Sequence, residues 1–487
     1  MNTIQRLLSN TALAFVANVV TRAGTTLLFI LIGRALGPTD SGVFSLGTTY
    51  FTIIFGLSAL GLHELLVREV APRRGESARY LINYMALRLV FALVSYFLLV
   101  LGLWFFQPYS PQTTQVVLIL ALAALPEAVS TICGALFEAH EQLAVPAMVA
   151  VVNAIIKLSG GFWLLRDGAN IANTDPVAAI AWLMVFAGVA GILIYPPALI
   201  RLLRRSPQHG RARPELGFSL SQLRQTPGFF TIHLFSVLDY QTDAFLISLM
   251  LTETDLGYYS AALTITLAIS LMSFAVRAAI YPVMSRYAHE APDKLALLYT
   301  KANQYLLALS LPIATAVCLL AQPIIRLIFG EEFGPAVPVL QISVWAAVFL
   351  LINVPNARLL LVDNRQGAAA WLTGISMTVN IVANLILIPL LGIIGSAMAR
   401  VLASAIFFLS IHLYVRANIL RGSFLPLLPR PMLATALMAL VIWALRDFPM
   451  IVPLIAGAAS YMTAALLLRV VPAEDLVYWR QAWRRSA

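Results

Sequence analysis

Apolar runs long enough to cross a membrane recur from one end of the chain to the other. A transmembrane helix needs about 20 consecutive apolar residues. Fourteen runs approach or exceed that length, at 11–32, 42–62, 80–106, 115–137, 144–165, 177–200, 228–252, 259–285, 302–323, 338–360, 367–390, 393–415, 431–447 and 450–470. The 487 residues are 60% hydrophobic and only 11% charged, whereas a soluble domain is about 25% charged. The sequence therefore predicts an all-α polytopic membrane protein with about 14 transmembrane helices.

The distribution of Lys and Arg predicts how these helices are oriented. If the N-terminus lies inside, the outer loops hold only Arg34, Arg166, Arg326 and Arg446, and the inner segments hold most of the other basic residues. Cytoplasmic loops carry such an excess of Lys and Arg. We therefore expect a multi-pass protein of the inner, cytoplasmic membrane with both termini in the cytoplasm. Because the net charge of +10 is spread over alternate loops rather than one face, we expect no nucleic acid as a partner.

Two short motifs occur twice in the same order, which indicates an internal repeat. GPTDSGVFS at 37–45 aligns with TETDLGYYS at 252–260, and VNAIIKLSG at 152–160 takes the place of VNIVANLIL at 379–387. Each half then has six helices, and an even number gives both halves the same orientation. This predicts two pseudo-symmetric six-helix lobes around a central cavity, followed by two C-terminal helices. The predicted divisions are an N-terminal lobe over 1–203, a cytoplasmic linker over 204–226, a C-terminal lobe over 227–416, and two helices with a cytoplasmic tail over 417–487.

Four stretches resemble one known superfamily of membrane transporters. They are GRALGPTDSGVFSL, TETDLGYYSAA, IIRLIFGEEFGPAVPVLQI and NLILIPLLGIIGSAMARV. In this order they resemble the polysaccharide-transport branch of the multidrug/oligosaccharidyl-lipid/polysaccharide exporter superfamily. The resemblance implies two six-helix lobes, alternating access, and a flippase that moves a polyprenyl-pyrophosphate-linked oligosaccharide across the cytoplasmic membrane for cell-surface polysaccharide synthesis. It implies a lipid-linked oligosaccharide and membrane lipid as partners, and other glycan-synthesis membrane proteins as further ones.

Charged residues inside the predicted helices mark the candidate substrate site. A charge at mid-bilayer costs about 2.5–3.5 kcal/mol on insertion scales, so it faces a cavity or a partner. The cations outnumber the acid Glu127 and two aspartates, and arginine binds phosphate through paired N–H donors. We therefore predict a cationic substrate site made of Arg22, Arg88, Lys157, Arg277 and Arg400. Structural salt bridges and snorkelling remain alternatives. Peptidoglycan-precursor flippases of the superfamily use arginines in the first and eighth helices, and Arg22 and Arg277 occupy similar positions.

Two carboxylates in the seventh predicted helix are candidates for ion coupling. Asp239 and Asp243 are four residues apart and share one helix face. Like charges there repel unless a cation lies between them or one is protonated. The superfamily resemblance adds Asn380 and Asn384, because sodium sites between the corresponding helices occur in peptidoglycan-precursor flippases. Sodium or protons are the possible coupling ions. The alternative, that the aspartates only neutralise cavity arginines, stays open.

Other function classes lack their sequence signatures. The sequence has no nucleotide-binding loop, metal-ligand cluster or nucleophile motif. We therefore predict a protein that is not an enzyme and has no cofactor. An ion-coupled drug or metabolite exporter of the same superfamily is the main alternative. A membrane polysaccharide polymerase is a weaker one, because it needs a sizeable outer loop with catalytic groups.

Overall fold

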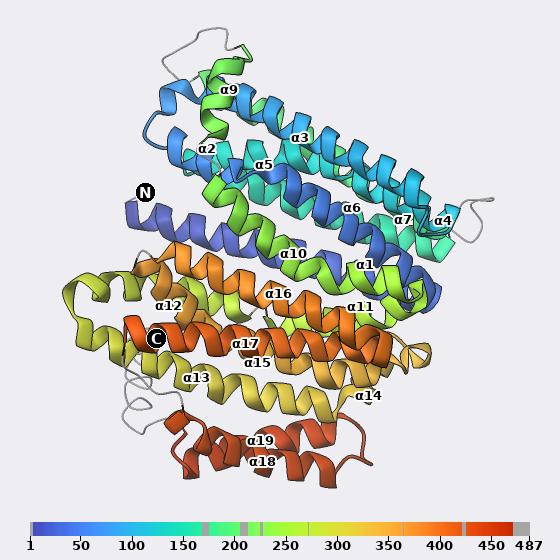
Figure 1. Ribbon diagram of the computed structural model, residues 1–487, viewed down its shortest axis with the longest axis vertical. Coiled ribbons are helices and arrows are strands. Elements are labelled where there is room, and N and C mark those ends of the chain that lie inside the picture. Colours follow the sequence, from blue (N-terminus) through green and yellow to red (C-terminus); the bar gives the residue numbers. More distant parts are fainter. Residues whose placement is uncertain are drawn as a thin grey trace. The chain divides into compact units, whose positions relative to one another are not determined.

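The computed structural model describes residues 3–167, 175–204, 213–224, 227–270, 272–363, 365–420 and 425–470, and within these ranges it contains helices and no strands (Figure 1). The prediction of an all-α fold is therefore confirmed. Contacts divide the chain into two units, Met1–Gly257 and Tyr258–Ala487. The predicted lobes were defined by the sequence repeat, and their boundaries stay a prediction.

The first unit is built around one very long helix. Its helices are α1 (Thr3–Ala59), α2 (Leu62–Val70), η1 (Arg74–Glu76), α3 (Ser77–Phe106), α4 (Pro111–Leu122), α5 (Ala124–Ala139), α6 (Ala144–Asp167), α7 (Pro176–Ile192), α8 (Tyr195–Arg204), α9 (Leu216–Leu223) and α10 (Pro227–Met250). α1 has 57 residues and packs against α3, α4, α6 and α10. It breaks at Gly37, whose φ of 83° is the left-handed conformation that glycine adopts easily. The first two predicted spans therefore lie on either side of this break.

Prolines explain two further interruptions in the first unit. The predicted span 115–137 divides into α4 and α5 at Ala123. Pro126 has no N–H to donate to the carbonyl of Leu122, so the helix cannot continue undisturbed there. The predicted span 177–200 divides in the same way into α7 and α8, just before Pro196 and Pro197.

The second unit is a bundle in which α15 and α17 make the most contacts. Its helices are the greater part of α11 (Glu253–Ser270), α12 (Met272–Glu290), α13 (Pro292–Leu319), α14 (Ala321–Ile328), η3 (Glu331–Phe333), α15 (Ala336–Val362), α16 (Gln366–Leu391), α17 (Ile393–Asn418), η4 (Leu425–Leu427), α18 (Pro429–Ala444) and α19 (Ile451–Leu467). α17 packs against both α15 and α16, and α13 packs against α15. α18 and α19 pack together, with α18 also against α13.

Nine segments of the described residues are long and apolar enough to cross a membrane. One of them, Val19–Ala59, has 41 residues and contains the break at Gly37. At 1.5 Å per residue this is twice the length that a single crossing needs. Two shorter apolar helices, α18 and α19, follow at the C-terminal end. The chain is thus a multi-pass membrane protein, while the number of fourteen spans stays a prediction.

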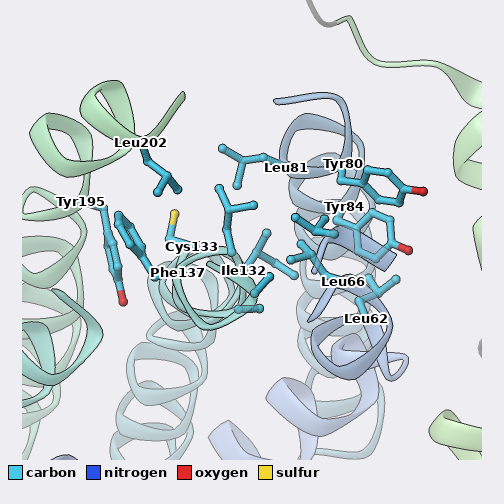
Figure 2. Close-up of a cluster of buried hydrophobic side chains, with 14 of the residues drawn as sticks. Leu62, Leu66, Tyr80, Leu81, Tyr84, Ile132, Cys133, Phe137, Tyr195 and Leu202 are labelled. Atoms are coloured by element: carbon cyan, nitrogen blue, oxygen red, sulfur yellow. The ribbon is translucent and has the colours of Figure 1, made fainter. Parts of the chain in front are cut away.

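One end of the first unit is closed by an apolar cluster that joins α2, α3, α5 and α8 (Figure 2). The apolar face of α2 repeats at i, i+3, i+4 and i+8, and its members Leu62, Leu65, Leu66 and Val70 are fully buried. The figure shows Ile132 of α5 pointing toward α2 and α3, and Phe137 stacked beside Tyr195. This packing holds α2, α3 and α5 together, and these three helices and α1 form a cavity lined by Arg88 and Glu64.

Candidate functional site

The structure distributes the predicted cationic residues over both units. Arg22 is exposed on α1, Arg88 is buried on α3, and Lys157 is half-buried on α6 of the first unit. Arg400 is half-buried on α17 of the second unit. Arg277 falls on α12, but its side chain lies outside the described residues. A shared substrate chamber for all five residues therefore stays a prediction.

Arg88 and Lys157 share one acid inside the first unit. The Glu127 carboxylate, on α5, acts electrostatically on both cations. Arg88 is only 2% exposed, and its guanidinium carbon lies 4.6 Å from the centre of the Phe55 ring. A cation over an aromatic face is stabilised by the ring's electrons but keeps its charge. Arg88 also interacts electrostatically with Glu64 of α2, so acids of α2 and α5 act on these two buried cations.

The coupling-ion candidates lie on α10 and α16. Asp243 is fully buried and Asp239 is half-buried, both on α10 of the first unit. Asn380 and Asn384 are fully buried on α16 of the second unit. Their membership of a common ion site stays a prediction. Among the described residues no group of three or more His, Cys, Asp or Glu could hold a metal ion, so an ion at α16 would depend on amide and hydroxyl oxygens.

A third polar residue joins the two asparagines. Asn384 Nδ2 donates to Asn380 Oδ1 over 3.0 Å, and Ser396 Oγ of α17 donates to Asn384 Oδ1 over 2.7 Å. Asn380 Nδ2 is buried without a hydrogen-bond partner. Gly395 allows this approach, because a Cβ there would overlap the carbonyl oxygen of Leu387. The sequence analysis did not name Ser396, because no local pattern pairs it with Asn384.

The two copies of the repeated motif contact each other within the first unit. The hydroxyls of Thr39 and Thr254 lie 2.8 Å apart. A Cβ on Gly42 would overlap the carbonyl oxygen of Glu253, and a Cβ on Gly257 would overlap that of Pro38. Glycine is therefore required at both positions for the backbones to approach so closely. Sequence reasoning found the motif but not this contact.

Further hydrogen bonds hold the end of α10 and the start of α11 against α1 and α4. The Tyr109 hydroxyl connects α1 to α10, because it lies 3.1 Å from the hydroxyl of Tyr50 on α1 and 2.9 Å from that of Ser248 on α10. Thr113 Oγ1 donates to Glu253 Oε1 over 3.3 Å. The start of α11 is thus joined to α1 by the motif contact, and the end of α10 is joined to α1 by a chain of hydroxyl groups.

Apolar helices of membrane-spanning length, a repeated helix-break motif and charges buried among the helices define a polytopic helical membrane protein. Residues 7–288, more than half of the chain, match the family described as "Polysaccharide biosynthesis protein". The chain belongs to this family.

Known relatives and structures agree with that assignment. The chain is 24% identical over 398 residues to "Probable low-salt glycan biosynthesis flippase Agl15" of Haloferax volcanii, covering 80% of each protein. Its fold is similar to that of lipid II flippase MurJ in an inward closed conformation, with a TM-score of 0.74, 16% identity, and coverage of 95% of this chain and 98% of that one. It is also similar to that of an inward-facing multidrug resistance MATE family transporter of the MOP superfamily, with a TM-score of 0.65 and 13% identity. This match covers 82% of this chain and 95% of that one.

The family match agrees with the predicted polysaccharide-transport branch, and the solved structures confirm the predicted fold. The similar proteins are named as flippases or transporters, in agreement with the prediction of a transporter.

Proposed function

We propose that this protein is a flippase that moves a polyprenyl-pyrophosphate-linked oligosaccharide across the cytoplasmic membrane by alternating access, for cell-surface polysaccharide synthesis. The observation that carries the proposal is the excess of cations in the membrane-spanning part, where Arg88 and Lys157 share Glu127. Family membership supports a role in polysaccharide synthesis, and the Haloferax relative is named as a glycan flippase.

The chemistry of the substrate explains why cations are useful there. Its negative charge is concentrated on two phosphates, and a guanidinium donates two parallel hydrogen bonds to phosphate oxygens. Arg22 is exposed on α1, so its donors are accessible to a ligand. We assign Arg22 and Arg277 as the principal phosphate contacts, with Lys157 and Arg400 as further cations of the chamber.

The proposal includes ion coupling and an orientation. Asp239, Asp243, Asn380 and Asn384 would bind the coupling sodium ion or proton, and Ser396 would add a hydroxyl oxygen. Both termini would lie in the cytoplasm, so the headgroup would enter from the cytoplasmic side. Other membrane proteins of glycan synthesis are the proposed partners beyond membrane lipid and the lipid-linked oligosaccharide.

Transport of a labelled lipid-linked oligosaccharide into proteoliposomes tests the proposal. Arg22→Ala and Arg277→Ala should each abolish transport, and replacement by Lys should restore only part of it, because a point charge lacks the forked geometry. Arg34→Ala is the matched control, since Arg34 is also exposed on α1 and should be dispensable. Full transport in both Ala variants would overturn the assignment of these arginines.

An ion-coupled drug or metabolite exporter is the second candidate, because the fold is also that of a MATE transporter. The same proteoliposomes separate the two candidates. Gradient-driven uptake of organic cations without oligosaccharide transport would favour the exporter.

A further inference from the structure

A cavity of about 130 Å³ lies inside the first unit, where α1 ends and α2 begins. It is lined by Phe55, Ala59, His63, Glu64, Arg88, Thr131 and Ile132. Ile132 also belongs to the apolar cluster in Figure 2, so one wall of the cavity is part of a closely packed core. The cavity is therefore formed by α1, α2, α3 and α5 without any ligand.

Arg88 lines this cavity and has hydrogen-bond donors without a partner among the described residues. Its Nε and Nη2 atoms are buried and have no hydrogen-bond partner. These two nitrogens lie on the same edge of the guanidinium, so their N–H groups donate in parallel, as in bidentate recognition of a carboxylate or phosphate. The Phe55 ring covers the face of the group, so it does not accept from that edge. Buried donors of a charged group are costly to leave unpaired, which favours an acceptor in the cavity.

The acids near the cavity leave the donors of Arg88 unpaired. Arg88 interacts electrostatically with Glu127 and Glu64, and Lys157 also interacts with Glu127. Glu64 lines the cavity, but it is exposed, so water screens its charge. The carboxylate of Glu138 is engaged by His63, whose Nε2 lies 3.1 Å from its Oε2. Arginine keeps its charge in a protein, and no carboxylate in the described part of the chain accepts a hydrogen bond from Nε or Nη2 of Arg88.

We propose that this cavity binds a small oxyanion, a carboxylate or a single phosphate group, with two oxygens on Nε and Nη2 of Arg88. Its volume is well below the about 300–1,000 Å³ of sites for drug-sized ligands, so it excludes an oligosaccharide. The anion is either a free ion or one phosphate of a lipid carrier. Only the second source rests on the proposed function. Arg88 then contacts phosphate or carboxylate and never the sugars.

Thermal unfolding of the full-length protein in phospholipid-free detergent tests this site. Inorganic phosphate and formate are each titrated against chloride at constant ionic strength. A ligand that binds only the folded state raises the unfolding midpoint saturably. We expect this rise in the wild type with at least one of the two probes. It should be lost in Arg88→Gln and partly kept in Arg88→Lys. Arg34→Gln, at an exposed arginine of α1, should keep it in full.

A second variant tests the cavity if Arg88→Gln does not fold. Ala59→Leu fills the cavity and keeps every charge, so it should lose the same rise. An unchanged wild-type midpoint with both probes, or an equal rise in wild type and Ala59→Leu, overturns the proposal.

Competition identifies the source of the anion. Polyprenyl pyrophosphate that removes the response to the probes assigns the ligand to the carrier lipid, and an unaltered response assigns it to a free ion. This experiment measures no transport. It can therefore contradict the anion site without contradicting the flippase function, and a failed transport assay would leave the anion site untouched.

Discussion

The side-chain hydroxyls of Thr39 and Thr254 lie 2.8 Å apart, although 215 positions separate the two residues in the chain. They occupy the same place in the two copies of the repeated motif, and so do Gly42 and Gly257, each of which packs against the backbone of the other copy. When two copies of a motif contact each other through equivalent residues, the two copies are related by a two-fold axis. The contact therefore supports the internal repeat in three dimensions.

A disulfide between positions 39 and 254 should stop transport. In the Thr39→Cys/Thr254→Cys variant, oxidation should join the two sulfurs, because the present hydroxyls already lie within hydrogen-bond distance. Alternating access requires one end of the protein to open, and the bond would prevent separation here. Transport in proteoliposomes should fall under oxidation and return after reduction. Thr39→Cys alone should be insensitive, and full transport by the crosslinked protein would show that this contact persists throughout the cycle.

Gly257→Ala should destabilise the protein by about 1–3 kcal/mol, as overpacking of a close contact does. The added Cβ would overlap the carbonyl oxygen of Pro38, and backbone atoms cannot turn away as side chains do. Gly102→Ala on α3 is the control, since a Cβ there meets no atom within 4 Å. Denaturation in detergent measures both variants. Equal stability of the two would contradict the close approach of the motifs.

Asn83→Ala should release α9 from α3. Asn83 Oδ1 accepts hydrogen bonds from Glu215 N over 2.7 Å and from Ser219 Oγ over 3.0 Å. Two bonds of about 1 kcal/mol each correspond to roughly a 30-fold change in the docking equilibrium. Limited trypsin digestion at Arg213 or Arg224 should accelerate accordingly. Leu220→Ser changes a side chain that is 58% exposed and should leave the cleavage rate unchanged.

The stability of the first unit should depend on pH through His63. Burial lowers the pKa of His63, but the hydrogen bond to Glu138 and the charges of Glu138 and Glu64 outweigh it, so the pKa is raised. The folded state thus favours the protonated ring. This contribution is fully present below the ordinary pKa of about 6.5 and is lost as the pH rises through the raised value.

Glu138→Gln tests this pH dependence. The wild type should exceed the variant in unfolding midpoint at acidic pH, and the difference should shrink as the pH rises. A difference that stays constant from acidic to alkaline pH would contradict a role for His63 protonation.

The helices and their interruptions follow largely from local sequence. The length of an apolar run determines whether a segment can cross a membrane. Glycine and proline determine where a helix breaks. Gly37 with the following Pro38 ends the first crossing, and Pro126 separates α4 from α5. These effects act within a few residues, so they can be read before any tertiary contact is known.

The site could be predicted only in part, because its contacts join distant segments. The sequence showed that cations outnumber acids in the predicted helices, and the structure shows that Arg88 and Lys157 both interact electrostatically with Glu127. The hydrogen bond from Ser396 to Asn384 and the approach of Gly42 to Gly257 could not be foreseen. The local sequence around a serine or a glycine does not indicate which distant segment that residue will contact.

The two C-terminal helices are short for a membrane. α18 has 16 residues and α19 has 17, so they extend about 24 and 26 Å, against about 30 Å of hydrocarbon. Such hydrophobic mismatch is relieved by compression of the surrounding lipid, at fractions of a kcal/mol per Å. If α18 and α19 cross the membrane as the sequence predicts, we expect the acyl chains around them to be shorter or more disordered than those around α15, which has 27 residues. The predicted crossings would then give the protein a thin patch of lipid beside these two helices.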